Sequence, residues 1–232
     1  MIKDQLKEIR AHIKEAAQRA ARSEDDITLI AVSKTYPVTA IKEAVLEGCT
    51  DFGENHVQEL MSKIDSVKEN VNWHLIGHLQ TNKVKYVVGK TSLIHSMDSL
   101  KLAEEIEKQS AKRGIVTSVL VEVNVADEAT KYGFKLDEVM GVMKILNTMP
   151  HIKVKGLMTV APYVENPEKN RPIFRKLYEL SVDIQKQNLD NISTSILSMG
   201  MSNDYQIAIE EGATMVRVGT AIFGNRDYSK KN

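Results

Sequence analysis

Short apolar runs alternate with longer amphipathic segments along nearly the whole chain of 232 residues. Eight of these runs have the length and composition of buried strands, and each is followed by a helical pattern or a short helical turn. Parallel strands need a crossover, which a helix provides, so eight such units favour an α/β fold of the (β/α)8 TIM-barrel type. The predicted strands are 28–34, 51–54, 72–77, 92–96, 118–125, 152–159, 193–199 and 214–219.

Helical spacing of apolar residues occurs between these strands and also ahead of the first one. Residues 1–24 are predicted to form an extra N-terminal helix that packs on the barrel. No linker rich in proline, glycine or serine divides the chain, so we expect residues 1–232 to form a single domain. The alternative is an open doubly wound sheet, but its Gly-rich phosphate turn is missing after the first strand. The other predicted helices are 39–48, 56–69, 81–88, 99–114, 136–149, 167–187 and 204–212.

Charge and cysteine content indicate which partners and which cellular compartment to expect. The chain has 31 basic and 31 acidic residues, so charge gives no reason to expect nucleic acid or a membrane as a partner. Cys49 is the only cysteine, which rules out an intramolecular disulfide and suits a reducing compartment. The N-terminus lacks the apolar region of a signal peptide. We therefore expect a cytoplasmic protein, and we also expect a monomer. We expect no metal site, because His74 and His78 lie on and just after a strand, where a spacing of four residues does not present two ligands together as it does on a helix.

Lys34 stands where the first predicted strand ends, and active sites of such barrels lie at the C-terminal ends of the strands. The two-residue period of a strand places Ile30, Val32 and Lys34 on one face, so the lysine points inward if the branched pair does. Its amine could pair with a phosphate or form an imine with a carbonyl ligand. Imine chemistry needs a lowered pKa, since only about one lysine in 2,500 is neutral at pH 7. Arg217 on the neighbouring last strand could supply the cation that lowers it.

Two glycine-containing loops follow the seventh and eighth predicted strands, at "SMGMSND" and "VRVGTAIFG". These loops are the usual phosphate site of such barrels, because backbone N–H groups and a helix terminus favour an anion. Glycine lets the backbone approach the ligand closely. The alternative is that both glycines merely turn the chain, but two such loops at adjacent strand ends favour a phosphate.

Six motifs together resemble the pyridoxal phosphate homeostasis proteins, which are single-domain relatives of the alanine racemase N-terminal barrel. They occur in order from residue 31 to residue 228 and read "AVSKTYP", "FGENHVQEL", "WHLIGHLQTNK", "GLMTVAPY", "LSMGMSND" and "VRVGTAIFGNRDY". The resemblance implies that Lys34 holds pyridoxal 5'-phosphate as a Schiff base. It implies further cofactor-binding residues at the phosphate, at the ring and in the pocket lining: Ser202, Gly219 and Thr220; Asn55 and Arg217; Ser198 and Met199.

The resemblance also implies a role in intracellular homeostasis of the cofactor, by buffering it and delivering it to apo forms of pyridoxal-dependent enzymes. An arginine beside the pyridine nitrogen disfavours a proton there and weakens the ring as an electron sink. Racemisation needs a second acid or base opposite Lys34, and nothing in the sequence places a tyrosine there among Tyr36, Tyr132, Tyr163 and Tyr205. We therefore expect no catalytic residue. The alternatives are a pyridoxal-phosphate-dependent amino-acid racemase and a barrel enzyme that acts on a phosphorylated metabolite.

Overall fold

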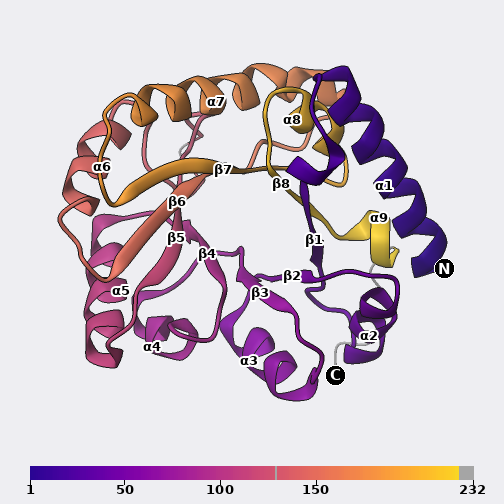
Figure 1. Cartoon of the computed structure of the whole chain (residues 1–232), viewed down its shortest axis with the longest axis horizontal. Coiled ribbons are helices and arrows are strands. Elements are labelled where there is room, and N and C mark those ends of the chain that lie inside the picture. Colours follow the sequence, from indigo (N-terminus) through magenta and orange to yellow (C-terminus); the bar gives the residue numbers. More distant parts are fainter. Residues whose placement is uncertain (129, 225–232) are drawn as a thin grey trace.

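Eight parallel strands form a closed barrel in the computed structural model, which describes residues 1–128 and 130–224 (Figure 1). Each strand pairs with the next in sequence, and β8 pairs with β1 from Thr28 opposite Met215 to Ala31 opposite Val218. This closure confirms the predicted barrel and rules out the open sheet. The strands are β1 (Thr28–Val32), β2 (Asp51–Glu54), β3 (Asn72–Leu75), β4 (Leu93–Met97), β5 (Thr117–Glu122), β6 (Ile152–Met158), β7 (Ile192–Met201) and β8 (Met215–Val218).

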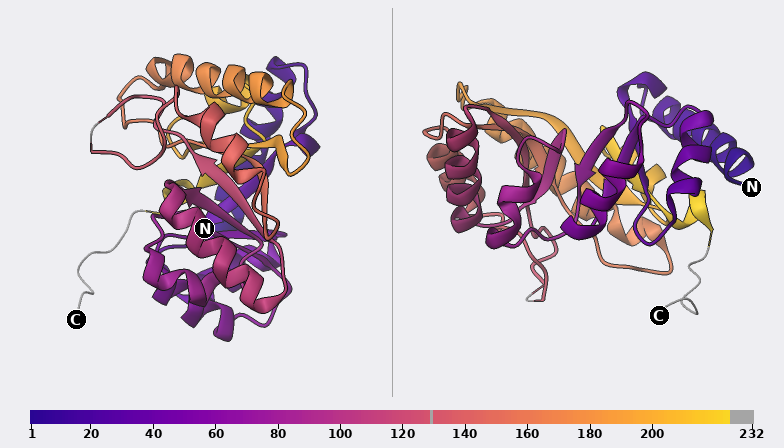
Figure 2. Two further views of the ribbon diagram at one scale, coloured as in Figure 1. Left: turned by 90° about the vertical axis from the view of Figure 1, so that its left-hand side faces the viewer. Right: turned by 90° about the horizontal axis from the view of Figure 1, so that it is seen from below.

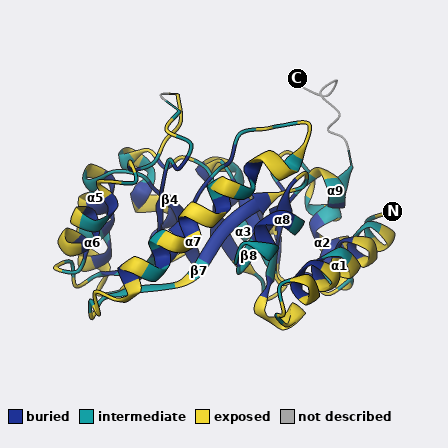
Figure 3. Ribbon diagram, turned by 90° about the horizontal axis from the view of Figure 1, so that it is seen from above, coloured by how far each residue is buried: buried dark blue, intermediate teal, exposed yellow. Residues whose placement is uncertain are grey.

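Helices surround the barrel, with exposed residues on their outer faces and buried residues toward the strands (Figure 3). Each predicted helical segment contains a helix, although segment 81–88 divides into a short 3-10 turn, Thr81–Lys83, followed by α4. The helices after β1 are α2 (Val38–Leu46), α3 (Val57–Ser66), α4 (Val84–Val87), α5 (Leu100–Arg113), α6 (Val139–Leu146), α7 (Arg171–Gln185), α8 (Tyr205–Glu210) and α9 (Thr220–Phe223).

The N-terminal helix α1 (Ile2–Arg19) lies on the outside of the barrel beside α8 and α9 (Figure 1). It is shorter than the predicted segment 1–24. Ser23 caps a separate 3-10 turn at Glu24–Asp26 by accepting a hydrogen bond from the backbone of Asp25, and Asp26 completes a capping box. Serine and aspartate favour such caps over helix interiors, which explains why the helix ends early.

Strand β1 ends at Val32, two residues before Lys34, because the chain turns at this point. The backbone N–H of Tyr36 donates to the oxygen of Ser33 at 3.0 Å, and Thr35 has a φ of 70°. A positive φ is an outlier for a β-branched residue and costs on the order of 1–3 kcal/mol. The turn carrying Lys34 is therefore a strained segment that its surroundings must hold in place.

Two apolar layers have very different sizes. The larger lies between the strands and the helices and contains most of the buried aliphatic and aromatic residues. Inside the barrel only a small cluster forms around Leu93, Leu120 and Met158, and much of the remaining interior is polar. The loops after β5 and β6 project from the same side of the barrel (Figure 2). These loops lie at the end of the barrel where the strands terminate.

Candidate functional site

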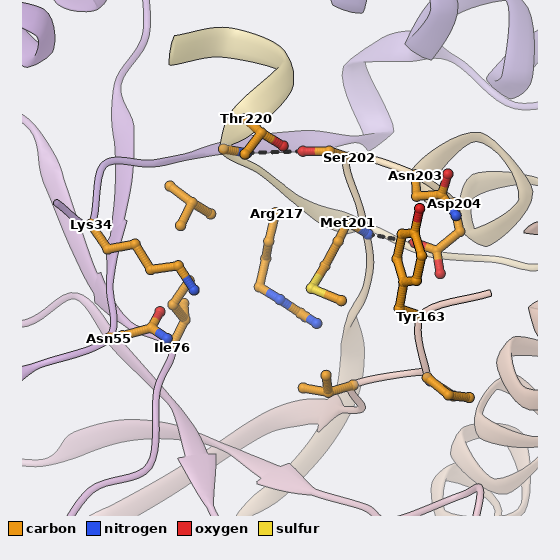
Figure 4. A pocket seen from close by; sticks show the side chains of 14 residues that line it. Lys34, Asn55, Ile76, Tyr163, Met201, Ser202, Asn203, Asp204, Arg217 and Thr220 are labelled. Atoms are coloured by element: carbon orange, nitrogen blue, oxygen red, sulfur yellow. Dashed lines mark hydrogen bonds between the residues drawn. The ribbon is translucent and has the colours of Figure 1, made fainter. Parts of the chain in front are cut away.

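A cavity of about 340 Å³ opens at the C-terminal ends of the strands (Figure 4). Its size falls in the range of small-molecule sites, which is roughly 300–1,000 Å³. Most of the residues singled out in the sequence line it, and they come from the ends of β1, β2, β7 and β8. Those residues are Lys34, Asn55, Ser202, Arg217, Gly219 and Thr220.

Lys34 extends into this cavity from the turn after β1 (Figure 4). Val32 lines the same cavity, as the two-residue period of the strand predicts, whereas Ala31 packs in the layer between strands and helices. The predicted inward direction of Lys34 is therefore confirmed.

The residues on both sides of Lys34 are held by hydrogen bonds from β2 and α3. The Ser33 hydroxyl donates to Glu54 Oε1 at 2.6 Å, and Lys63 Nζ donates to the Ser33 backbone oxygen at 2.7 Å. On the other side, the Thr35 backbone N–H donates to Glu59 Oε1 at 2.6 Å. These contacts fix the strained turn that carries Lys34.

Lys63 joins the two carboxylates that make these contacts into one ion triad. Its Nζ lies 2.7 Å from Glu54 Oε1 and 2.6 Å from Glu59 Oε1, and Glu54 and Lys63 are both buried. Burial raises the pKa of Glu54, while the charge of Lys63 and its hydrogen bond oppose that rise. Sequence reasoning missed this triad. The available signal was the pair Glu59 and Lys63, four residues apart on a predicted helix, directly after the strand end that carries Glu54.

Asn55 lies at the end of β2 and points toward the same part of the cavity as Lys34 (Figure 4). Gly77, just after β3, packs directly against it. A Cβ atom on Gly77 would lie 2.5 Å from the backbone oxygen of Asn55 and 2.7 Å from its Cα. Only glycine allows this close approach, so Gly77 sets where Asn55 sits.

The loops after β7 and β8 meet along another edge of the cavity. The backbone N–H of Gly219 donates to Ser202 Oγ at 3.3 Å, and Thr220 follows at the start of α9. Gly200 has a φ of 90°, and a Cβ there would lie 2.6 Å from Ala208 Cβ. The backbone at Gly200, the next-to-last residue of β7, therefore requires glycine, and Ser202 follows directly after the strand and lines the cavity.

Arg217 reaches the cavity from β8, with only 4% of its surface exposed. Its Nη1 donates to Ser198 Oγ at 2.5 Å, and its Nη2 donates to the backbone oxygen of Thr159 at 2.9 Å. Burial lowers the pKa of Arg217 to about 10, against the opposing charges of Glu122 and Asp204. The group stays protonated at neutral pH and presents a fixed positive charge.

Ser198 and Met199 do not line the cavity, contrary to the expectation from the resemblance. Met199 is fully buried in the layer between the strands and the helices, because alternation along β7 turns it outward. Ser198 points inward but lies below the cavity, where Arg217 and His95 cover it. Its hydroxyl contacts Arg217, which lines the cavity.

Among the tyrosines considered in the sequence, Tyr163 lines the cavity and is 83% exposed. Tyr132 stacks on His78 with ring centroids 3.8 Å apart, beside a neighbouring cavity. The Tyr36 hydroxyl donates to the backbone oxygen of Gly224 at 2.6 Å. The Tyr205 hydroxyl oxygen lies 3.1 Å from Nδ1 of His12 on α1. Tyr36 and Tyr205 thus serve packing.

Two further features are absent from the described residues, 1–128 and 130–224. No group of three or more histidine, cysteine or acidic residues there is arranged to hold a metal ion. None of the helices in that part of the chain is both long and apolar enough to cross a membrane.

The fold and the lysine at the barrel mouth define a class of protein, the barrels of the alanine racemase N-terminal domain, whose family model matches residues 5–227. Within that class the chain belongs to the pyridoxal phosphate homeostasis protein family. It is 46% identical over 226 residues to the pyridoxal phosphate homeostasis protein of Aquifex aeolicus (strain VF5), covering 97% of this chain and 98% of that protein.

Solved structures agree with this placement. The structure of PipY from Synechococcus elongatus PCC7942 with PLP bound matches with a TM-score of 0.84 and 30% identity, over 97% of this chain and all of PipY. Alanine racemase of Clostridium difficile 630 matches with a TM-score of 0.76 and 16% identity, over 99% of this chain and 59% of the racemase. At that identity the second match shows a shared fold only.

Proposed function

We propose that the protein binds pyridoxal 5'-phosphate reversibly through Lys34 and takes part in intracellular homeostasis of this cofactor. One observation carries the proposal: Lys34 and Arg217 line the same cavity as the loops after β7 and β8, which contribute Ser202 and Gly219. The relative PipY, whose structure has PLP bound, is 30% identical to this chain over the whole length of PipY.

The chemistry of the lining residues fits this cofactor. Pyridoxal 5'-phosphate brings an aldehyde, a phosphate and a pyridine ring, and the cavity offers an amine, a hydroxyl edge and a buried guanidinium. When bound, the cofactor supplies an aldehyde that condenses reversibly with amines. The residues of this chain then bind, orient and shield it.

Each residue has a proposed role. Lys34 Nζ is the point of covalent attachment. Ser202, Gly219 and Thr220 hold the phosphate, because a hydroxyl and backbone N–H groups suit an anion. Asn55 lies beside the ring, and Arg217 faces the pyridine nitrogen, where its charge disfavours protonation.

A carrier role agrees with the relatives and with the weak support for catalysis. The curated relatives bear the name of homeostasis proteins and not of racemases. An attachment through an amine protects a reactive aldehyde, and another amine can displace it by exchange. The proposal extends to hand-over of the cofactor to apo forms of pyridoxal-dependent enzymes.

The proposal also includes a monomeric protein that acts in the cytoplasm, with residues 1–232 working as one cofactor-binding unit. Light scattering of the purified chain with and without cofactor tests the monomer. A stable dimer in both states would contradict that part without affecting the role of Lys34.

The test is covalent labelling with pyridoxal 5'-phosphate followed by borohydride reduction and peptide mapping. We expect visible absorbance from the loaded protein and a reduced adduct on Lys34, both lost in Lys34→Ala. Lys83 lines a neighbouring cavity, so Lys83→Ala is the matched control and keeps the adduct. A protein that stays colourless and unlabelled would refute the cofactor assignment.

A second measurement separates a carrier from an enzyme. The loaded protein is incubated with single L-amino acids in deuterated water, and exchange of the α-proton is followed. Turnover of about one per second or faster is ordinary for enzymes. Exchange at such rates would favour the racemase alternative and contradict the carrier role.

A further inference from the structure

A chain of four side-chain hydrogen bonds crosses the inside of the barrel below the cavity. Arg217 Nη1 lies 2.5 Å from Ser198 Oγ, and Ser198 Oγ lies 2.9 Å from His95 Nδ1. His95 Nε2 lies 3.0 Å from His74 Nδ1, and His74 Nε2 lies 2.9 Å from Asp51 Oδ1. The five residues come from β8, β7, β4, β3 and β2, so the chain links strands on opposite sides of the barrel.

The hydrogen-bond chain is buried from Arg217 to His74, and Asp51 at its end is partly buried. Ser198 and His95 have no exposed surface, and His74 is 3% exposed. A polar group in such a place costs about 1–3 kcal/mol if its hydrogen bond is left unmade. Each donor and each acceptor in the chain therefore needs a partner, which limits where the hydrogens can be.

The two ends fix the direction of the hydrogen bonds. Arginine carries only donors, so Ser198 Oγ must accept from Arg217. Burial raises the pKa of Asp51, but hydrogen bonds from His74 and Thr50 outweigh burial and leave that pKa below its usual range. An ionised Asp51 only accepts, so His74 Nε2 must carry a hydrogen and donate it.

One arrangement of hydrogens between these ends uses every donor. The Ser198 hydroxyl donates to His95 Nδ1, and His95 Nε2 donates to His74 Nδ1. Both imidazoles are then neutral, with their hydrogen on Nε2. Every bond runs from Arg217 toward Asp51.

The competing arrangement reverses the middle of the chain and leaves a hydrogen without an acceptor. A cationic His74 would donate to His95, and His95 Nδ1 would donate to Ser198 Oγ. Among the described residues, Ser198 Oγ has hydrogen bonds only with Arg217 and His95. Its hydroxyl hydrogen would then point at no acceptor inside a closed barrel.

We propose that His95 and His74 are positioning residues for Arg217, both neutral and both protonated at Nε2, which hold Ser198 as the acceptor of Arg217. Together with the Thr159 oxygen on Nη2, Ser198 fixes the plane of the guanidinium. The inference rests on the proposed function only for the task of Arg217, which is to face the pyridine nitrogen.

The charges around the chain agree with neutral imidazoles. Burial lowers the pKa of His95 well below its usual value, and the charge of the neighbouring Arg217 lowers it further. A second cation next to Arg217 inside the barrel would be repelled by it. With both imidazoles neutral, the hydrogen bonds give Arg217 an acceptor in Ser198 without adding positive charge.

The first test reads the histidine tautomers in the unmodified protein without cofactor. Nitrogen-15 NMR of the imidazole rings at pH 7 to 8 distinguishes a ring protonated at Nε2 from one protonated at Nδ1 and from a cation. We expect Nε2-protonated neutral rings for His74 and His95, which Gln substitution at each position assigns. A hydrogen on Nδ1 of His95 or a cationic His74 would overturn the proposal.

The second test compares two substitutions that differ in hydrogen bonding. Glutamine can accept from Ser198 through its oxygen and donate to His74 through its nitrogen, whereas leucine can do neither. We expect His95→Leu to speed the hydrogen exchange of the Arg217 guanidinium at least about tenfold, and His95→Gln to change it less than about threefold. An unchanged exchange rate in His95→Leu would overturn the positioning role.

These readouts separate the inference from the proposed function. Both use the protein without cofactor, so a protein that fails to bind pyridoxal 5'-phosphate can still confirm or refute the hydrogen-bond chain. If His95→Leu does not fold, Ser198→Ala provides the same comparison of Arg217 exchange, and an unchanged rate there carries the same negative meaning.

Discussion

The ammonium nitrogen of Lys63 lies 2.7 Å from the backbone oxygen of Ser33, the residue immediately before Lys34. The same ammonium contacts Glu59, whose carboxylate accepts the backbone N–H of Thr35, immediately after Lys34. The lysine at the cavity thus sits in a strained turn held on both sides by one buried lysine and its carboxylates.

Removing the charge of Lys63 should destabilise the fold strongly. In Lys63→Met, Glu54 remains buried without its counter-ion, and breaking a buried pair costs about 3–5 kcal/mol. We expect a loss of this size in the free energy of unfolding, measured by urea denaturation.

Lys68 is an exposed lysine close to the same helix and provides the control for that measurement. Lys68→Met should change the free energy of unfolding by less than about 0.5 kcal/mol. Equal stability of the two variants would show that the triad contributes little.

Removing the Glu59 carboxylate should weaken cofactor binding more than replacing it with an amide. Glu59→Ala leaves the Thr35 N–H without its acceptor, whereas Glu59→Gln keeps an oxygen there. We expect about a tenfold loss of affinity for pyridoxal 5'-phosphate in the alanine variant, which is the effect of one lost hydrogen bond to a charged group. Titration followed by visible absorbance measures it, and equal affinities in both variants would contradict the positioning of Lys34 by Glu59.

Glu122 should make the stability fall as the pH rises. Burial raises its pKa from 4.5 to about 7, with the nearby charge of Asp98 adding to the rise. Between these values the folded protein keeps a proton that the unfolded chain releases, so the free energy of unfolding decreases as the pH rises through that window. The loss amounts to about 3 kcal/mol above pH 7.

Glu122→Gln removes this dependence because glutamine does not ionise. We expect the variant to gain stability relative to the parent protein between pH 5 and pH 8, as measured by urea denaturation at both values. Glu69→Gln, at an exposed position, should show no such gain. A pH-independent difference between Glu122→Gln and the parent protein would refute the assignment.

Gly77→Ala should displace Asn55 and lower stability. The added methyl group would lie 2.5 Å from the Asn55 backbone oxygen, and overpacking of this kind costs about 1–3 kcal/mol. Gly141 in α6 has no atom within 4 Å of the added Cβ, so Gly141→Ala should instead stabilise the helix by about 0.5–1 kcal/mol. Thermal unfolding of both variants measures the contrast. An unchanged stability of Gly77→Ala would show that the backbone around Gly77 and Asn55 can shift to accept the methyl group.

Much of the fold and the cavity lining could be predicted from sequence. The period of the apolar residues fixes which segments are strands and which are helices, and the two-residue alternation turns Val32 and Lys34 to the same side. The same alternation, followed past Ser198, would have turned Met199 outward. The error there came from applying the resemblance to two consecutive residues that a strand must point in opposite directions.

The sequence by itself determined the barrel class, the inward lysine and the loops at one end, because these depend on local periodicity and on chain order. Only the tertiary structure decided that Asp51, His74, His95 and Ser198 meet inside the barrel and that Lys63 reaches Ser33. His95 and Ser198 are 103 residues apart, and their contact depends on how far each strand is staggered against the next when the sheet closes. No local pattern encodes that stagger, so the polar interior could only be read from the folded barrel.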